Sequence, residues 1–285
     1  MVSLTDLLID GRARANFGVA GVSIVKSHSI EVHASECIGS PALVIEVASV
    51  SVVSSLLRGD HASSYYFSTI PAHAAVVARD ARVDMRSVTL LGGDGYYLSH
   101  PFGVVNTPPM PTITATNSVI WVGGMATTAH SGLGAAENVA APAVRVEGGS
   151  VTIDPATSLR GFKNSLPVIG SGVVHWATLP TLKIEGGVLG QNVTVTHGVR
   201  AGPTRALVSY VGIAGPPLPT WIGDWGLTTM ALPWYLGTTD RPVATFALPL
   251  DSSLSGISIS AQAWIDTGPS SSGPRLTNIA SLRLQ

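Results

Sequence analysis

The sequence predicts an all-β protein in which a solenoid of short parallel strands is followed by a small antiparallel β-sandwich. Apolar residues alternate with small or polar ones over short stretches, as in VSVVSSLLRGD at residues 50–60, which is the period of a strand. The same outline returns several times in one chain direction, which is typical of stacked repeats rather than mirrored hairpins. From about residue 191 the repeat gives way to longer alternating runs.

The repeat is clearest when its glycines are aligned. Successive units end at Gly39, Gly59, Gly92 and Gly161, and Cys37 takes the apolar position two residues before the first of them. A unit of about 20 residues can bury its inward side chains only against the units above and below it. We therefore expect each unit to form one coil, stacked about 4.8 Å from the next, with the glycines at its bends. In this arrangement Cys37 is a buried core residue.

Two long loops leave the predicted coil after a corner glycine, at residues 60–73 and 94–142, and each begins with an aspartate followed by a tyrosine pair. Equivalent corners of stacked coils lie above one another, so both loops should project from the same side. Flat aromatic faces beside a carboxylate suit sugar rings and protein contacts. The predicted ligand-binding residues are Tyr65, Tyr66, Tyr96, Tyr97, Asp60 and Asp94. Two alternatives stay open: the tyrosines fold back over the coil, and residues 117–138 form a degenerate coil.

The last third of the chain has the pattern of antiparallel strands. In GISISAQAWID at residues 256–266, the isoleucines and alanines share one face, and the serines, Gln262, Trp264 and Asp266 share the other. That alternation predicts a strand with one buried and one solvated face. Six such runs, separated by Pro/Gly-rich turns such as AGPPLPT at residues 214–220, predict a β-sandwich over residues 191–285 after a solenoid over residues 1–190.

With these features, residues 1–190 resemble the right-handed parallel β-helix repeat family, the shape of pectate lyases, tailspikes and many large bacterial surface proteins. The carboxy-terminal runs resemble modules of secreted and surface-anchored bacterial proteins. The resemblance implies an extracellular or cell-surface location. It also implies a structural or adhesive role, with a polysaccharide-active enzyme and a phage tailspike or fibre as alternatives.

A lyase or glycosidase on the coil wall would need acidic and basic residues grouped on one strand face. Lyases of this shape use acidic calcium ligands and an Arg or Lys base. The candidate enzyme face is Arg79, Arg82, Asp84 and Arg86. Alternation with apolar residues puts the last three on one face, which a solvated, ion-paired surface also explains. Because the chain has no Asp-Asp pair, the sequence favours a protein without catalytic residues.

The composition limits the kinds of partner that we expect for this protein. Only 12% of the 285 residues are charged, against about 25% in ordinary soluble proteins, and the net charge is −1. Three lysines give no basic footprint for nucleic acid, and no apolar run is long enough for a membrane span. The histidines lack metal-ligand spacing, so no metal or cofactor is expected. An unpaired parallel edge at the end of a solenoid favours self-association. We therefore expect a homo-oligomer or filament and a glycan or cell-surface partner.

Overall fold

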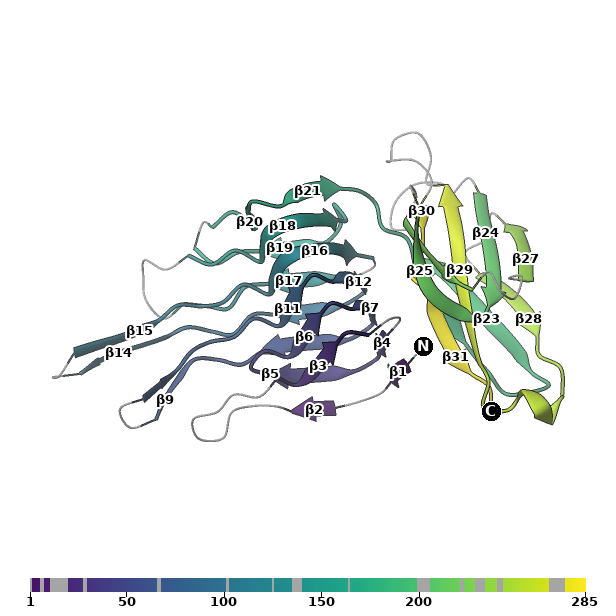
Figure 1. The fold of residues 1–285 in the computed structure, drawn as a ribbon, viewed down its shortest axis with the longest axis horizontal. Coiled ribbons are helices and arrows are strands. Elements are labelled where there is room, and N and C mark those ends of the chain that lie inside the picture. Colours follow the sequence, from purple (N-terminus) through teal and green to yellow (C-terminus); the bar gives the residue numbers. More distant parts are fainter. Residues whose placement is uncertain are drawn as a thin grey trace.

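The computed structural model describes residues 2–5, 8–10, 20–27, 30–65, 68–100, 103–124, 126–134, 140–163, 165–198, 206–220, 223–228, 234–239, 243–266 and 275–285. The protein is all-β (Figure 1), and η1 (Ser252–Leu254) is the one helical element in those ranges. Within them, no helix has the length and apolar character needed to cross a membrane. Large parallel sheets precede small antiparallel ones, as the sequence predicts.

The parallel strands form three walls, and each turn of the chain passes through them in order. Wall one contains β3 (Val22–Val25), β6 (Leu43–Glu46), β11 (Val76–Arg79), the first part of β16 (Ile113–Gly123), the first part of β18 (Val144–Ile153) and β20 (Val168–Gly170). Wall two contains β1 (Val2–Thr5), β4 (Ile30–His33), β7 (Ser49–Val53), β12 (Arg82–Arg86), the remainders of β16 and β18, and β21 (Val173–Trp176). Wall three contains β2 (Leu8–Asp10), β5 (Glu36–Gly39), β8 (Leu56–Gly59), β13 (Thr89–Leu91), β17 (Thr128–His130) and β19 (Ser158–Arg160). Every neighbouring pair runs parallel, which confirms the predicted stacking.

The walls enclose a core built from like residues at the same register. Val50 pairs with Val83, Val83 with Ile120, and Ile120 with Val151, and all four are buried. Cys37 is also buried in this core, as predicted, and burial raises the pKa of its thiol. Stacking branched apolar side chains in columns removes them from water without requiring a helix.

The bends of the coil differ from the prediction that glycines mark them. Between walls one and two, and again between walls two and three, single residues with positive φ turn the chain, and most of these are not glycine. They are Lys26, Val47, Asp80 and Asn117 at the first bend and Ala34, Ser54 and Ser87 at the second. Glycines with positive φ occur at Gly148 and Gly149 in the first bend and at Gly124 in the second, and glycines also mark the third bend, where the chain returns to wall one. At Gly59 the reason is a close approach, because a Cβ there would lie 2.0 Å from the carbonyl oxygen of His73.

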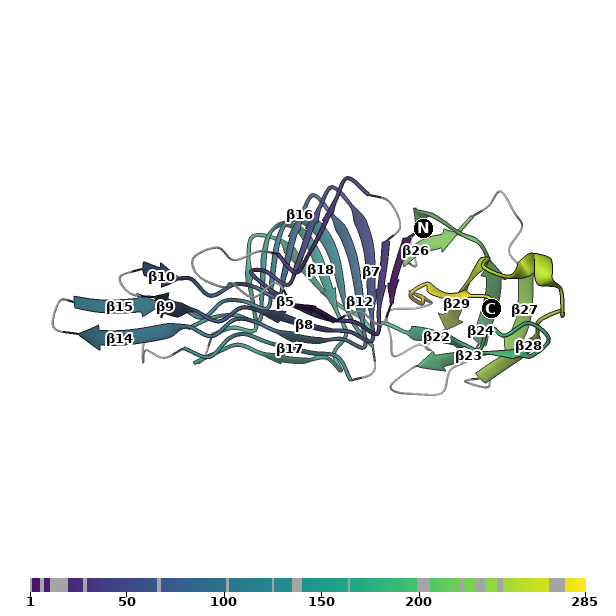
Figure 2. The ribbon, with the colours of Figure 1, turned by 90° about the horizontal axis from the view of Figure 1, so that it is seen from below.

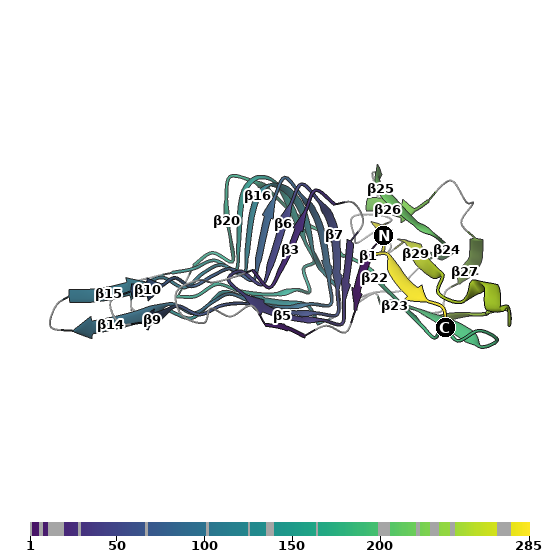
Figure 3. The ribbon, with the colours of Figure 1, turned by 60° about the horizontal axis from the view of Figure 1, so that its bottom comes forward.

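The two predicted loops contain β-hairpins. β9 (Ser63–Tyr65) pairs with β10 (Ser68–Ile70), and β14 (Tyr96–His100) pairs with β15 (Gly103–Thr107). Both hairpins extend in the same direction, away from the carboxy-terminal sheets (Figures 2 and 3). The predicted loop over residues 94–142 was too long, because β16 and β17 inside it complete another turn of the solenoid. The alternative of a degenerate coil is therefore correct for this segment.

The carboxy-terminal strands pair antiparallel in three small sheets, and residues of the first two sheets form a second core. The first sheet contains β22 (Thr181–Glu185), β23 (Asn192–Gly198) and β28 (Val243–Ala247). The second contains β24 (Ala206–Gly212), β27 (Trp234–Thr239), β29 (Ser258–Asp266), β30 (Arg275–Leu276) and β31 (Ala280–Arg283). The third contains β25 (Ala214–Thr220) and β26 (Gly223–Leu227). The change to antiparallel pairing thus falls between Trp176 and Thr181, earlier than the predicted residue 191.

Two details of these sheets correct the sequence analysis. The predicted turn AGPPLPT is strand β25, whose register shifts between Ala214 and Leu218, so Pro216 and Pro217, which cannot donate to the ladder, fall at the irregularity, whereas Pro219 is paired with Asp224. The predicted solvated face of β29 is buried at its centre. Gln262 is 1% exposed, accepts a hydrogen bond from the Gly226 N–H (2.9 Å) and donates one to the Thr277 carbonyl (3.0 Å). Packing of a second layer over this face could not be read from the alternation in one strand.

Candidate functional site

A hollow on the solenoid lies at the third bend, near the start of the two hairpins. It is a half-open pocket of about 340 Å³, and we call it the corner pocket. Its polar and aromatic lining consists of Arg58, His61, Asp94, His130, Ser131, Arg160 and Phe162. His61 lies two residues before β9 and Asp94 two residues before β14, so the pocket is at the root of both projecting hairpins. Concave surfaces with a few converging polar groups are the usual form of ligand sites.

The parallel register of wall three builds the pocket. Arg58 pairs with Leu91, Leu91 with His130, and His130 with Arg160, on four successive strands. The residues before the first three, Leu57, Leu90 and Ala129, are fully buried in the core, and Leu159, before Arg160, packs against the same core and is partly buried. Because side chains alternate along a strand, the ladder from Arg58 to Arg160 must face outward. The stacking of the coils therefore brings together side chains that are far apart in the sequence.

One side of the corner pocket is an ordered polar chain. The guanidinium of Arg58 contacts Nε2 of His61, and Nδ1 of His61 lies 2.9 Å from a carboxylate oxygen of Asp94. The backbone N–H of Asp94 also lies 3.0 Å from Nδ1 of His61, so both ring nitrogens of this histidine have partners. The second oxygen of Asp94 accepts a hydrogen bond from the Leu133 N–H at 2.7 Å.

The other side is less constrained. His130 lies between the ladder positions of Leu91 and Arg160, and its Nε2 is 3.4 Å from the Ser158 hydroxyl. Burial, with a further contribution from the Arg160 charge, lowers the pKa of His130, which keeps the imidazole neutral at pH 7. Arg160 is exposed and forms no ion pair with any residue that the structure describes. The pocket thus offers a cation, a neutral imidazole and an aromatic face.

The predicted ligand-binding residues separate into groups. Asp94 lines the corner pocket, whereas Asp60 does not: its carboxylate accepts a hydrogen bond from the Ser40 hydroxyl at 3.1 Å. Tyr96 and Tyr97 lie on β14, outside the pocket, and Tyr97 is 45% exposed. Tyr65 is the last residue of β9, and Tyr66 lies outside the described residues. The structure therefore brings one of these residues, Asp94, to the pocket and places Tyr96 and Tyr97 on a hairpin that starts near it.

The predicted enzyme face lies on walls one and two, away from the corner pocket. Arg79 pairs with Glu46, and Arg82 lies over the Trp121 ring at 5.2 Å. Asp84 pairs with Arg86 through two contacts, one of them 3.2 Å long. Arg86 itself is only 3% exposed, so this part of the face is not the solvated surface that the alternation suggested. The reason is that the carboxy-terminal sheets lie against wall two (Figure 1).

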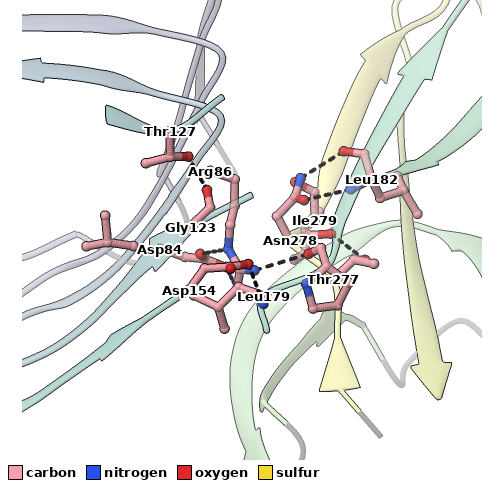
Figure 4. Close-up of polar contacts among 12 residues, drawn as sticks. Asp84, Arg86, Gly123, Thr127, Asp154, Leu179, Leu182, Thr277, Asn278 and Ile279 are labelled. Atoms are coloured by element: carbon pink, nitrogen blue, oxygen red, sulfur yellow. Dashed lines mark hydrogen bonds and ion pairs between the residues drawn. The ribbon is translucent and has the colours of Figure 1, made fainter. Parts of the chain in front are cut away.

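The segment that connects the two parts of the protein forms hydrogen bonds with the solenoid and with the carboxy-terminal sheets, as Figure 4 shows. Arg86 donates a hydrogen bond to the Pro180 carbonyl (3.1 Å), and Asp154 accepts one from the Leu179 N–H (2.9 Å). Beyond them, Asn278 bonds both the N–H and the carbonyl of Leu182, at 2.8 and 3.0 Å. We call residues 177–182 with these partners the junction. Arg86 and Asp154 therefore stabilise the connection between the two parts of the protein.

Glu31 is the other charged residue of wall two that the carboxy-terminal sheets cover. It is 1% exposed, and neither carboxylate oxygen has a hydrogen-bond partner within the described part of the chain. Burial raises the pKa of Glu31 from 4.5 to about 7. The nearby hydroxyl and backbone of Ser281 lower it by a smaller amount, although their geometry is not that of a hydrogen bond. A carboxyl group in this position is neutral more often than charged at slightly acidic pH.

Sequence reasoning missed most of the corner pocket, although one signal was present. The residue directly before each corner glycine is Ile38, Arg58, Leu91 or Arg160, so two arginines occur at equivalent places in the repeat. His61, His130 and Phe162 carry no such mark. In the residues that the structure describes, no three His, Cys, Asp or Glu side chains come close enough to hold a metal ion.

Comparison of the chain with protein-family models, with curated proteins and with solved structures finds no match. The geometry of the corner pocket and of the walls around it is therefore the basis on which a function is assigned.

Proposed function

We propose that this protein is a non-catalytic adhesive protein, secreted or displayed on a cell surface, that binds a glycan in the corner pocket. In this proposal the three walls are a right-handed parallel β-helix and the carboxy-terminal sheets are a small β-sandwich. The single observation that carries the proposal is the ladder from Arg58 to Arg160 at the root of two hairpins that project the same way.

The lining of the pocket is better suited to binding a sugar than to catalysing a reaction. Phe162, Leu91 and Leu133 provide apolar surface for the face of a ring, and the imidazole of His130 provides a hydrogen-bonding group beside it. His61, the residue best placed for proton transfer, has both ring nitrogens engaged by Arg58 and Asp94. A general base needs a free nitrogen within reach of the substrate. Recognition without turnover is therefore the function that this geometry supports best.

Glycan-array screening followed by calorimetric titration of each hit tests this proposal. His130→Ala should lower the affinity severalfold because it removes a polar group from the pocket. The matched control is His175→Ala, an exposed histidine on β21, and it should bind like the parent protein. Absence of binding to every glycan, or equal losses in both variants, would overturn the proposal. Shortened or unsaturated sugars in the same incubations would contradict its non-catalytic part.

Self-association is the second part of the proposal, and the last turn of the solenoid supports it. Among the described strands β21 pairs only with β18, and Val173 and Trp176 on β21 are 57% and 55% exposed. An unpaired parallel edge with apolar side chains is suited to a second copy of the chain. Sedimentation velocity over a range of concentrations should show oligomers that Trp176→Ser weakens. Leu250→Ser, which changes an 86% exposed residue elsewhere, is the control. A concentration-independent monomer would exclude this part.

A further inference from the structure

The charged side chains of the corner pocket differ in the interactions that they make with the rest of the protein. Among the described residues, three charged side chains line it: Arg58, Arg160 and Asp94. Both carboxylate oxygens of Asp94 already have a partner: one lies 2.9 Å from Nδ1 of His61, and the other accepts a hydrogen bond from the Leu133 N–H. Arg58 reaches the same network through His61. Arg160, at the opposite end of the ladder, forms no ion pair with any described residue.

Among the residues that the structure describes, no carboxylate forms an ion pair with Arg160. Its neighbour across the strand pair is His130, whose pKa is lowered by burial and by the Arg160 charge itself. His130 is therefore neutral at pH 7 and can accept a hydrogen bond but cannot act as a counter-ion. The whole chain is charge-poor, with 12% charged residues and a net charge of −1, so a local positive excess in a pocket is not a general property of the surface.

The spacing of the ladder also matters. Arg58 and Arg160 are three strand spacings apart, about 14 Å along the axis of the stack, with Leu91 and His130 between them. A ligand that lies along this ladder meets a cation at each end and apolar or neutral surface in the middle. The planar guanidinium fork matches a carboxylate or a sulfate through two parallel hydrogen bonds.

We infer that the corner pocket selects acidic glycans, with Arg160 binding a carboxylate or sulfate group and Phe162, Leu91 and Leu133 contacting the face of a ring. This inference rests on the proposed carbohydrate-binding function and specifies its ligand. The carboxylate and the sulfate share the same recognition chemistry, so the test has to separate them.

The experiment is calorimetric titration of the full chain with an oligouronate, a sulfated oligosaccharide and a neutral oligosaccharide of equal length, at low and high salt. We expect an acidic sugar to bind at least about tenfold more tightly than the neutral one, and Arg160→Ala to remove at least about tenfold of that affinity. Which acidic sugar binds better identifies the acid group. Arg160→Lys should recover only part of the affinity, since it keeps the charge but not the fork.

Arg145→Ala is the matched control, because Arg145 is an exposed arginine on β18 and does not line the pocket. It should bind the acidic sugar like the parent protein, and thermal unfolding should be the same in all variants. If the neutral sugar binds as tightly as the acidic ones and Arg160→Ala has no effect, this inference is wrong while the proposed function stands. If no sugar of any kind binds, both are wrong.

Discussion

Walls two and three of the same solenoid carry charged residues at outward-facing positions, but two of those on wall two are buried and two of those on wall three are accessible. On wall two, Glu31 and Arg86 are 1% and 3% exposed because the carboxy-terminal sheets lie over them. On wall three, Arg58 and Arg160 line an open pocket. In both walls these charged side chains lie at outward-facing positions of parallel strands. The difference is set by what covers each wall, so exposure decides which charges are available to a ligand.

The comparison also separates two energetic regimes. A charge that has been removed from water must be paired or neutralised, or it costs several kcal/mol. An exposed charge keeps most of its hydration, and its contribution to folding is small. Substitutions on wall two should therefore affect stability, and substitutions on wall three should affect binding. The four predictions below test this division, from the largest expected effect to the smallest.

Arg86→Ala should cause the largest loss. It leaves Asp84, whose side chain is 25% exposed, without its cation and leaves the Pro180 carbonyl without its donor. Removing one partner of a largely buried ion pair typically costs about 3–5 kcal/mol, so we expect a loss of about 3 kcal/mol in the free energy of unfolding. Urea denaturation followed by circular dichroism measures it. The control is Arg79→Ala, whose pair with Glu46 is exposed and should contribute less than about 1 kcal/mol. Equal losses would show that wall two is not covered.

Glu31 should make stability depend on pH. Its pKa is about 7 in the folded protein and 4.5 in the unfolded chain, so the folded state binds more protons between these values. The penalty for burying the charge is complete above about pH 7 and disappears below about pH 4.5. Stability should thus fall as pH rises through this window, by on the order of 3 kcal/mol in total.

Unfolding curves at several pH values measure this slope. Glu31→Gln should remove it, because the amide does not titrate, and Glu147→Gln, at an exposed position on β18, should leave it unchanged. Ser51, the next residue of the outward ladder, and Ser281 on β31 are uncharged and cannot produce the slope. A slope that persists in Glu31→Gln would assign it to another group.

Much of the solenoid could be predicted from sequence because its information is local and repeated. The alternation around Val50 and Val83 fixes which side chains face inward, and the repeat fixes that like residues stack. The bends were harder. Val47 turns the chain with a φ of 51°, a conformation that branched residues rarely adopt, so nothing in its type announces it.

The covering of wall two could not be predicted from sequence at all. Arg86 and Pro180 are 94 residues apart, and no local pattern links them. Without that contact, RDARVDMR has the composition of an exposed, charged face, and the arginines nominated there are the ones the fold uses internally. The same absence of long-range information hid the corner pocket, because His61 and Asp94 meet only when two insertions leave adjacent turns of the solenoid.

Asp94→Ala should have an intermediate effect because Asp94 belongs to the open wall but is tied into its structure. It removes the hydrogen bond to the Leu133 N–H and the contact with His61. Hydrogen bonds to a charged group are worth about 1.5–3 kcal/mol when buried, and with 41% of this side chain exposed we expect a loss of about 1 kcal/mol. Thermal unfolding measures it. A loss as large as that of Arg86→Ala would mean that the pocket is a structural network like the junction.

Arg160→Ala should have the smallest effect on stability and completes the comparison. Arg160 is exposed and has no counter-ion among the described residues, so its removal breaks no interaction that folding depends on. Surface substitutions of this kind usually change the free energy of unfolding by less than about 0.5 kcal/mol. Urea denaturation of this variant and of Arg86→Ala should give the smallest and the largest loss in the free energy of unfolding, although both residues are outward-facing arginines of one solenoid. A residue that does little for the fold yet is held at a fixed place in a pocket is available for a ligand. A stability loss above about 1 kcal/mol would remove that argument and show that Arg160, like Arg86, serves the solenoid itself.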